Sequence, residues 1–406
     1  MSKQISGEPL TLANTLGNAP ELLRNEVDVR ITKLRPMATP VDQISRYAAS
    51  RPCRSMTVDY YAVATRGAEA KVTADSESVT VTPGSQTKVI LAVNDASIFE
   101  PSDTVMLPDS ESVNGSPMVF YVADVASDAL TLYPVFASGC VASVPAINAG
   151  AKVIRMGRAA AELDVQTSQY EALPEKKQNY CQIFKAQIEQ STMLKAANKE
   201  VGWTFSDQEE VAIYDMRQGM ERSFLFGNMA RITDPAKKSE VFLTGGIWNQ
   251  AGKQASYPSG KLNAAAWLKI MSEAFTGHGG SARKILIAGT ELIEQLSLLE
   301  GNQRVMLPGD VVSRWGLDFT EMHSKFGTLY VIHSEIMDSC GHSADGLIID
   351  PEYLTKYVHI PFSADTLDLR TSGQRNTEAV VLTEVSCLVL RYPEAHVRVI
   401  ATSDSQ

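Results

Sequence analysis

Residues 206–226 read SDQEEVAIYDMRQGMERSFLF and predict one long amphipathic helix. Its apolar positions recur at helical spacing, at Ile213, Met216, Met220 and Phe224. Ser206 and Glu209 have the spacing of a capping box at the start of the helix, and Gly227 offers a left-handed cap at its end. Strand-like sequence lies on both sides, so the remaining elements are expected to be organised around this helix.

Composition limits the classes of protein that this chain represents. The 406 residues are 44% hydrophobic and carry a formal net charge of -10, which predicts a folded protein with a sizeable core. An excess of acids argues against a protein whose main task is to grip nucleic-acid backbones. The five cysteines are scattered and odd in number, which indicates reduced thiols. No signal peptide and no segment long enough to span a bilayer is expected.

The N-terminal part is predicted to be an extended arm followed by a short helix. Thr39, Pro40 and Asp42 give a helix-start signature, and the helix is expected to run through Ala48. Three arginines, Arg46, Arg51 and Arg54, follow within a few residues. Such a cluster suits carboxylates on a partner chain or a neighbouring domain, and phosphate binding is the alternative interpretation.

The next part of the chain changes to short β-type segments. Between residues 72 and 156 runs such as TKVILAV and MVFYVADV alternate with turn-forming stretches, which predicts an inserted small barrel or sandwich. Residues 179–191, NYCQIFKAQIEQS, predict a half-exposed strand immediately before the long helix.

After the long helix, the pattern is that of an α/β unit. Residues 246–350 hold the buried-type strands KILIAG and TLYVIHS between predicted helices at 262–275 and 290–299. The tail, including AVVLTEVSCLVLR and AHVRVIAT, is rich in strands. These late strands are expected to return to the sheet beside the long helix.

No catalytic, cofactor-binding or metal-binding constellation is predicted. HExxH, GxSxG and P-loop motifs do not occur, and the glycines of TGHGGSARK are expected to form a turn. Cys340, His342 and His333 lack the ligand pairs and spacing of a zinc site.

The element order is extended arm, β excursion, strand, long helix, α/β unit and returning strands. It resembles the Hong Kong 97 type fold of major capsid proteins of tailed double-stranded DNA bacteriophages. NYCQIFKAQIEQST and the helix ending RSFLFGN are similar to the subfamily with a β domain inserted near the E-loop. The resemblance implies an α+β protein with an N-terminal arm (1–66) and an E-loop region (67–200) that holds the inserted β domain (72–156). It also implies a P domain (201–245 and 351–406) and an A domain (246–350).

This resemblance implies a structural protein, not an enzyme, that self-assembles into hexamers and pentamers of an icosahedral head enclosing double-stranded DNA. Implied partners are copies of the chain itself, a portal protein, separate scaffold and decoration proteins, and DNA in weak contact. The implied location is the virion, with assembly in the host cytoplasm. Arm contacts between subunits are assigned to Arg46, Arg51 and Arg54, and spine contacts to Asp215, Arg217, Glu221 and Arg222.

Two alternatives remain open from the sequence. One is an encapsulin-like nanocompartment, in which the same fold encloses a protein cargo. The other is a cytosolic α/β enzyme acting through residues 246–350, for which the sequence offers only the isolated His278, His323 and His333.

Overall fold

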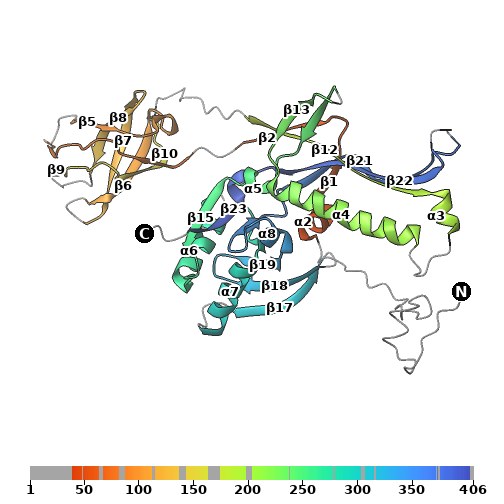
Figure 1. The fold of residues 1–406 in the computed structure, drawn as a ribbon. Helices are drawn as coiled ribbons and strands as arrows, with labels where there is room; N and C mark the ends of the chain where they lie inside the picture. The colour runs from red at the N-terminus through yellow and green to blue at the C-terminus, as the bar shows by residue number, and fades with distance from the viewer. Residues whose placement is uncertain are drawn as a thin grey trace, which may run out of the picture. The chain divides into compact units, whose positions relative to one another are not determined.

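The computed structural model describes residues 39–47, 49–63, 67–81, 87–111, 115–136, 143–162, 174–197, 204–236, 238–277, 279–302, 307–314, 317–371, 373 and 375–402. The chain forms two compact units. Unit 1 comprises residues 1–60 and 176–406, and unit 2 comprises residues 61–175. The chain contains both helices and strands, and their arrangement is that of an α+β protein, as predicted (Figure 1). No helix of the described part is long and apolar enough to cross a membrane.

The long helix α4 spans Phe205–Phe226 and confirms the predicted element. Its start differs from the prediction, because the capping box is formed by Thr204 and Asp207 and not by Ser206 and Glu209. The predicted apolar stripe is right: Met216, Met220 and Phe224 are buried, and Ile213 packs against the same core.

The end of α4 also differs from the prediction. Gly227 has a φ of -55°, so it is not a left-handed cap. A Cβ atom there would lie 2.5 Å from the carbonyl oxygens of both Ser223 and Thr244. Glycine is therefore needed at this position because another segment of backbone passes close to it.

A four-stranded sheet packs on α4. Its strands lie in the order β1 (Ala49–Pro52), β21 (Leu354–Asp368), β22 (Thr377–Leu390) and β12 (Gln182–Ser191). The alternation predicted for β12 is confirmed, since Phe184 and Ile188 are buried. The ring of Phe184 packs edge-on against Phe224 of α4, with the ring centroids 5.6 Å apart. One face of β12 thus forms core with α4, while Ile183 on the opposite face is 53% exposed.

A seven-stranded sheet forms the α/β part of unit 1. Its order is β15 (Lys253–Pro258), β23 (Val397–Thr402), β20 (Gly346–Ile349), β16 (Arg283–Ala288), β19 (Thr328–His333), β18 (Leu317–His323) and β17 (Leu307–Arg314). Helices α6 (Ala264–Phe275) and α7 (Thr290–Asn302) share one hydrophobic core with this sheet. The short helices α5 (Ile247–Gln250) and α8 (Glu335–Ser339) share the core that holds α4.

The placement of β23 corrects one expectation. The strand AHVRVIAT was expected beside the long helix, but β23 pairs parallel with β15 and antiparallel with β20 in the seven-stranded sheet. By contrast, β21 and β22 do return to the sheet beside α4, as expected.

Unit 2 is a small antiparallel barrel. Its strands lie in the order β3 (Glu69–Lys71), β10 (Lys152–Arg158), β6 (Asp103–Glu111), β7 (Pro117–Val125), β8 (Ala129–Val135) and β5 (Val89–Ala92). A bridge between Val72 and Val93, with the N–H of Thr73 donating to the carbonyl of Ala92, joins the two edges of the sheet. Buried side chains such as Phe120, Leu130 and Leu132 fill the interior.

The remaining elements are short. They are α2 (Pro40–Tyr47), β2 (Thr57–Ala62), β4 (Val79–Thr80), the 3-10 helix η2 (Ala96–Ile98), β9 (Ser143–Val144), β11 (Glu175–Tyr180), α3 (Thr192–Ala196), β13 (Ala230–Asp234), β14 (Ser239–Leu243) and the 3-10 helix η3 (Pro393–Ala395). Strand β2 pairs with β11, β4 with β9, and β13 with β14.

Candidate functional site: a buried polar junction

A buried carboxylate joins the long helix to the helix that follows the N-terminal segment. Glu221 of α4 is fully buried, and its Oε1 and Oε2 accept the backbone N–H groups of Val41 at 2.8 Å and Asp42 at 2.7 Å. These N–H groups belong to the first turn of α2, where no partner exists within the helix. Glu221 therefore caps α2 from a position 180 residues away in the sequence.

The side chain of Asp42 extends the junction to two further elements. Its carboxylate is buried and lies 2.7 Å from Arg46 within α2, 3.1 Å from Arg217 of α4 and 3.2 Å from Lys356 of β21. The Arg217 guanidinium also lies over the Phe362 ring, 5.2 Å from its centroid. One carboxylate thus ties together α2, the long helix and a strand of the four-stranded sheet.

Lys356 carries the network on to β22. Its Nζ lies 2.8 Å from Glu384, which is buried and accepts a hydrogen bond from Ser386 Oγ at 3.0 Å. Three carboxyl groups and three cationic side chains make up the junction: Asp42, Glu221, Glu384, Arg46, Arg217 and Lys356. Buried charges of this kind are stable only when they are paired, so the loss of one partner is costly.

Burial also changes the proton affinity of Glu221. Desolvation raises the pKa of Glu221 from 4.5 to about 8, with a further increase from Asp42. The hydrogen bonds from Val41 and Asp42 and the charge of Lys356 act in the opposite direction. The junction therefore has a group that changes its protonation near neutral pH.

The residues predicted to form contacts between subunits fall into two groups. Arg51, Arg54, Asp215 and Arg222 are exposed, and Arg46 is partly exposed while it pairs with Asp42. Arg217 is largely engaged within its own chain. The prediction that Glu221 contacts a neighbouring subunit is wrong, because its side chain is fully buried and caps α2 of its own chain.

Asp42, Lys356 and Glu384 were missed as parts of the site. Asp42 was predicted only as a first-turn acid of α2. Glu384 offered a signal, since it interrupts the apolar run AVVLTEVSCLVL, and charged residues inside such runs are rarely buried without a partner.

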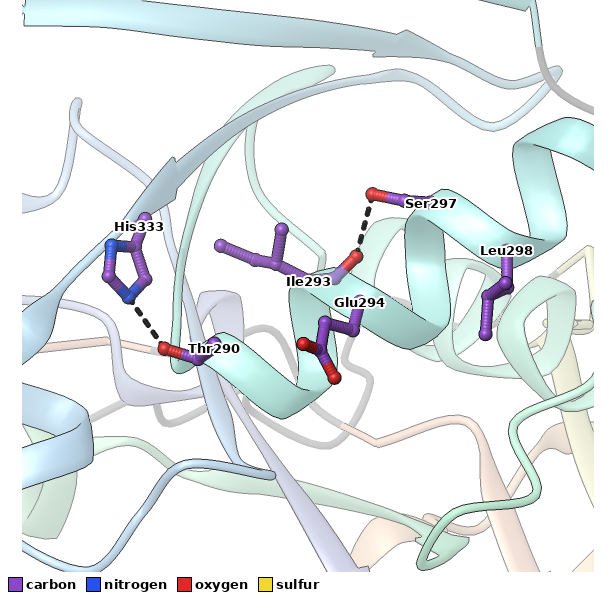
Figure 2. Close-up of a pocket in the computed structure, with 6 residues that line it drawn as sticks. All are labelled: Thr290, Ile293, Glu294, Ser297, Leu298 and His333. Carbon is purple, nitrogen blue, oxygen red and sulfur yellow. Dashed lines mark hydrogen bonds between the residues drawn. The ribbon is translucent and has the colours of Figure 1, made fainter.

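The α/β part contains a surface pocket that bears on the enzyme alternative (Figure 2). It is lined by Thr290, Ile293, Glu294, Ser297, Leu298 and His333. Thr290 Oγ1 and Asp338 Oδ2 both approach the same ring nitrogen, Nε2 of His333, at 3.0 and 2.9 Å. A histidine that passes a proton from a hydroxyl to a carboxylate uses its two nitrogens for the two partners, so this cluster lacks the relay geometry of a nucleophilic site.

His323, a second histidine named in the enzyme alternative, does not line this pocket. His323 is 3.2 Å from the hydroxyl of Thr328 at the end of its own strand pair, and His278 lies outside the described residues. Among the residues with a described position, no group of three His, Cys, Asp or Glu side chains is arranged to hold a metal ion.

Comparisons with known proteins place the chain in a family. The family model described as SU10 major capsid protein matches residues 9–403. No curated protein sequence matches the chain. A solved structure from Mycobacterium phage Adephagia is 10% identical, with 98% of this chain and 100% of that chain covered and a TM-score of 0.48. The empty capsid of a GTA particle is 9% identical, with 97% and 100% covered and a TM-score of 0.48.

A third solved structure, the holo-SrpI encapsulin complex from Synechococcus elongatus, is 8% identical, with 98% of both chains covered and a TM-score of 0.44. Because these scores are below 0.5, the assignment rests on the family match alone. That match covers nearly the whole chain, and the protein belongs to the SU10 major capsid protein family of structural capsid proteins.

Proposed function

We propose that the chain forms hexamers and pentamers of an icosahedral phage head that encloses double-stranded DNA. The observation that carries the proposal is the capsid-family match over residues 9–403. An icosahedral shell that is larger than one made of pentamers alone requires both ring sizes, because a sheet of hexamers closes only where pentamers introduce curvature.

The exposed end of the four-stranded sheet, at residues 364–368 of β21, is evidence for contacts between copies of the chain. In β21 the side chains are buried from Leu354 to Lys356 but exposed from Ala364 to Asp368. Apolar side chains remain open there, with Leu367 46% exposed and Met193 of α3 80% exposed. Burial of these apolar side chains by a neighbouring subunit would stabilise the assembly.

In this proposal the parts of the chain have the roles that the capsid resemblance implies. Residues 1–66 form the arm, 67–200 the E-loop region with its inserted barrel, 201–245 and 351–406 the P domain, and 246–350 the A domain. Strand β23 is an exception, since it lies in the sheet of the A domain. The proposed contacts between subunits remain Arg51, Arg54, Asp215 and Arg222, together with Arg46 and Arg217, which also pair with Asp42.

A formal net charge of -10 supports weak contact with the packaged DNA, because a shell of acidic subunits does not hold phosphate groups tightly. A portal protein, a separate scaffold and auxiliary capsid proteins complete the proposed set of partners. Assembly is proposed to take place in the host cytoplasm before the chain becomes part of the virion.

The test is mass photometry of the purified chain, expressed alone and together with the other structural proteins of its phage. Rings of five or six subunits, or closed shells, are the expected species. A stable monomer or dimer under both conditions contradicts the proposal.

A further inference from the structure

The outer surface of the barrel in unit 2 carries a row of apolar side chains. The strand register aligns Val135 of β8 with Val119 of β7, Val119 with Met106 of β6, and Met106 with Ile154 of β10. Met118, Val105 and Val153 are the sequence neighbours of Val119, Met106 and Ile154 and are buried in the interior, so the row lies on the outside. Four neighbouring strands give the row a length of roughly 14 Å.

A second row reinforces the first. Tyr133 is paired with Tyr121, and Tyr121 with Thr104, two residues further along the same strands. Val135 is 50% exposed, and the other side chains of both rows are partly exposed. Tyrosines beside an aliphatic centre are the composition found at the core of protein interfaces. We call the seven residues of these two rows the barrel strip.

The charge around the barrel strip identifies the kind of partner. Residues 61–175 contain 14 acidic and 6 basic residues, a formal charge of -8, whereas the whole chain carries -10. Exposed acids lie at both ends of the barrel strip: Asp109 and Glu111 follow Met106 along β6, and Asp124 and Asp128 lie beyond the tyrosine row. The basic residues Lys152 and Arg158 lie at the β10 side, and each is paired with an acid of the same unit, Lys152 with Glu69 and Arg158 with Asp103. An apolar centre with an acidic rim is complementary to an apolar patch with a basic rim.

Charge also argues against the simplest alternative occupant. If two copies of the barrel met through the barrel strip, the acids at both ends would face acids of the same kind, which is unfavourable. Nucleic acid is repelled for the same reason. We propose that the barrel strip docks a different protein of the particle, one that presents apolar side chains surrounded by lysine and arginine. This inference rests on the chain being assembled in a particle.

The experiment uses particles grown in the phage's host. The photoreactive residue p-benzoylphenylalanine replaces Val135, or in the control replaces Ala74, which is exposed after β3 and lies on none of the four strands of the barrel strip. Wild-type chain is co-expressed so that particles assemble, and particle formation is checked by microscopy before irradiation. Crosslinked peptides are then identified by mass spectrometry.

We expect the substitution at Val135, and not the one at Ala74, to crosslink a different virion polypeptide through a lysine- and arginine-rich segment. Particles made with Val119→Asp should contain at least tenfold less of that polypeptide, and 1 M NaCl should release it from wild-type particles. Normal particles in which Val135 crosslinks only further copies of the chain, nucleic acid, an acidic polypeptide or nothing would overturn the inference and leave the proposed function intact. Failure of the wild-type chain to form particles would overturn both.

Discussion

Glu221 and Val41 are 180 positions apart in the sequence, yet the Glu221 carboxylate accepts the Val41 N–H at 2.8 Å and thereby caps α2 from within the long helix. This contact attaches α2 to the core around α4, so separation of the two helices would leave the N–H groups of Val41 and Asp42 without an acceptor.

Removal of the cap should destabilise the subunit strongly. Glu221→Ala leaves two buried N–H groups without acceptors, and we expect the free energy of unfolding to fall by about 3 to 5 kcal/mol. Urea unfolding of the unassembled subunit measures it. The matched control is Arg222→Ala, the exposed neighbour on the same helix, for which the change should stay within about 0.5 kcal/mol. Equal effects of the two substitutions would show that Glu221 is not a structural cap.

The raised pKa of Glu221 predicts a defined dependence of stability on pH. The pKa of Glu221 is 4.5 in the unfolded chain and about 8 in the folded chain. Between pH 4.5 and about pH 8, Glu221 is therefore protonated in the folded chain and ionised in the unfolded chain. The contribution of Glu221 to stability therefore falls as the pH rises from about 4.5 to about 8 and is constant above that. Glu221→Gln cannot titrate, so the stability advantage of wild type over this variant should shrink between pH 5 and pH 8. Parallel pH curves for the two proteins would contradict the assignment.

Three thiols that lie close to one another should be unreactive in the folded protein. Cys181 Sγ lies 3.6 Å from Cys53 Sγ and 3.5 Å from Cys387 Sγ. Burial raises the pKa of Cys53 to about 12, and the hydrogen bond with Cys387 together with burial raises that of Cys181. Iodoacetamide at pH 8 should therefore alkylate the exposed Cys340 at least tenfold faster than these three, as followed by peptide mass spectrometry. Rapid labelling of Cys181 without unfolding would be inconsistent with this packing.

The exposed arginines should affect assembly without affecting the fold. Arg51→Glu combined with Arg54→Glu changes side chains that lie on the surface, so the unfolding midpoint of the subunit should be unchanged. If they contact carboxylates of a neighbour, the yield of shells should fall at least tenfold, as measured by sedimentation. The control is Lys88→Glu, because Lys88 is exposed on the barrel. Arg158→Glu is unsuitable as a control because Arg158 pairs with Asp103. Normal shell yield from the double variant would remove these arginines from the proposed interface.

The sequence predicted those elements whose pattern is local. Met216, Met220 and Phe224 define the buried stripe of α4 by spacing alone, and the alternation around Phe184 defines β12. The N-cap of α4 lies at Thr204, two residues before the predicted Ser206, because Thr204-Phe-Ser-Asp207 and Ser206-Asp-Gln-Glu209 both fit a capping box. Only the folded structure determines which of the two sequences forms the capping box.

The parts that could not be predicted depend on contacts between distant segments. An acid such as Glu221 on an amphipathic helix has the pattern of a solvated residue, and only the position of α2 turns it into a buried cap. The period of two in β23 is compatible with either sheet of unit 1, so pairing with β15 and β20 decided its place.

Cryo-electron microscopy of particles purified from infected cells will show which polypeptide builds the shell. We expect a closed shell whose five-fold and six-fold rings are both built from this chain, with density for double-stranded DNA inside. A shell whose rings are built from another polypeptide, or a purified chain that never appears in rings, would contradict this expectation.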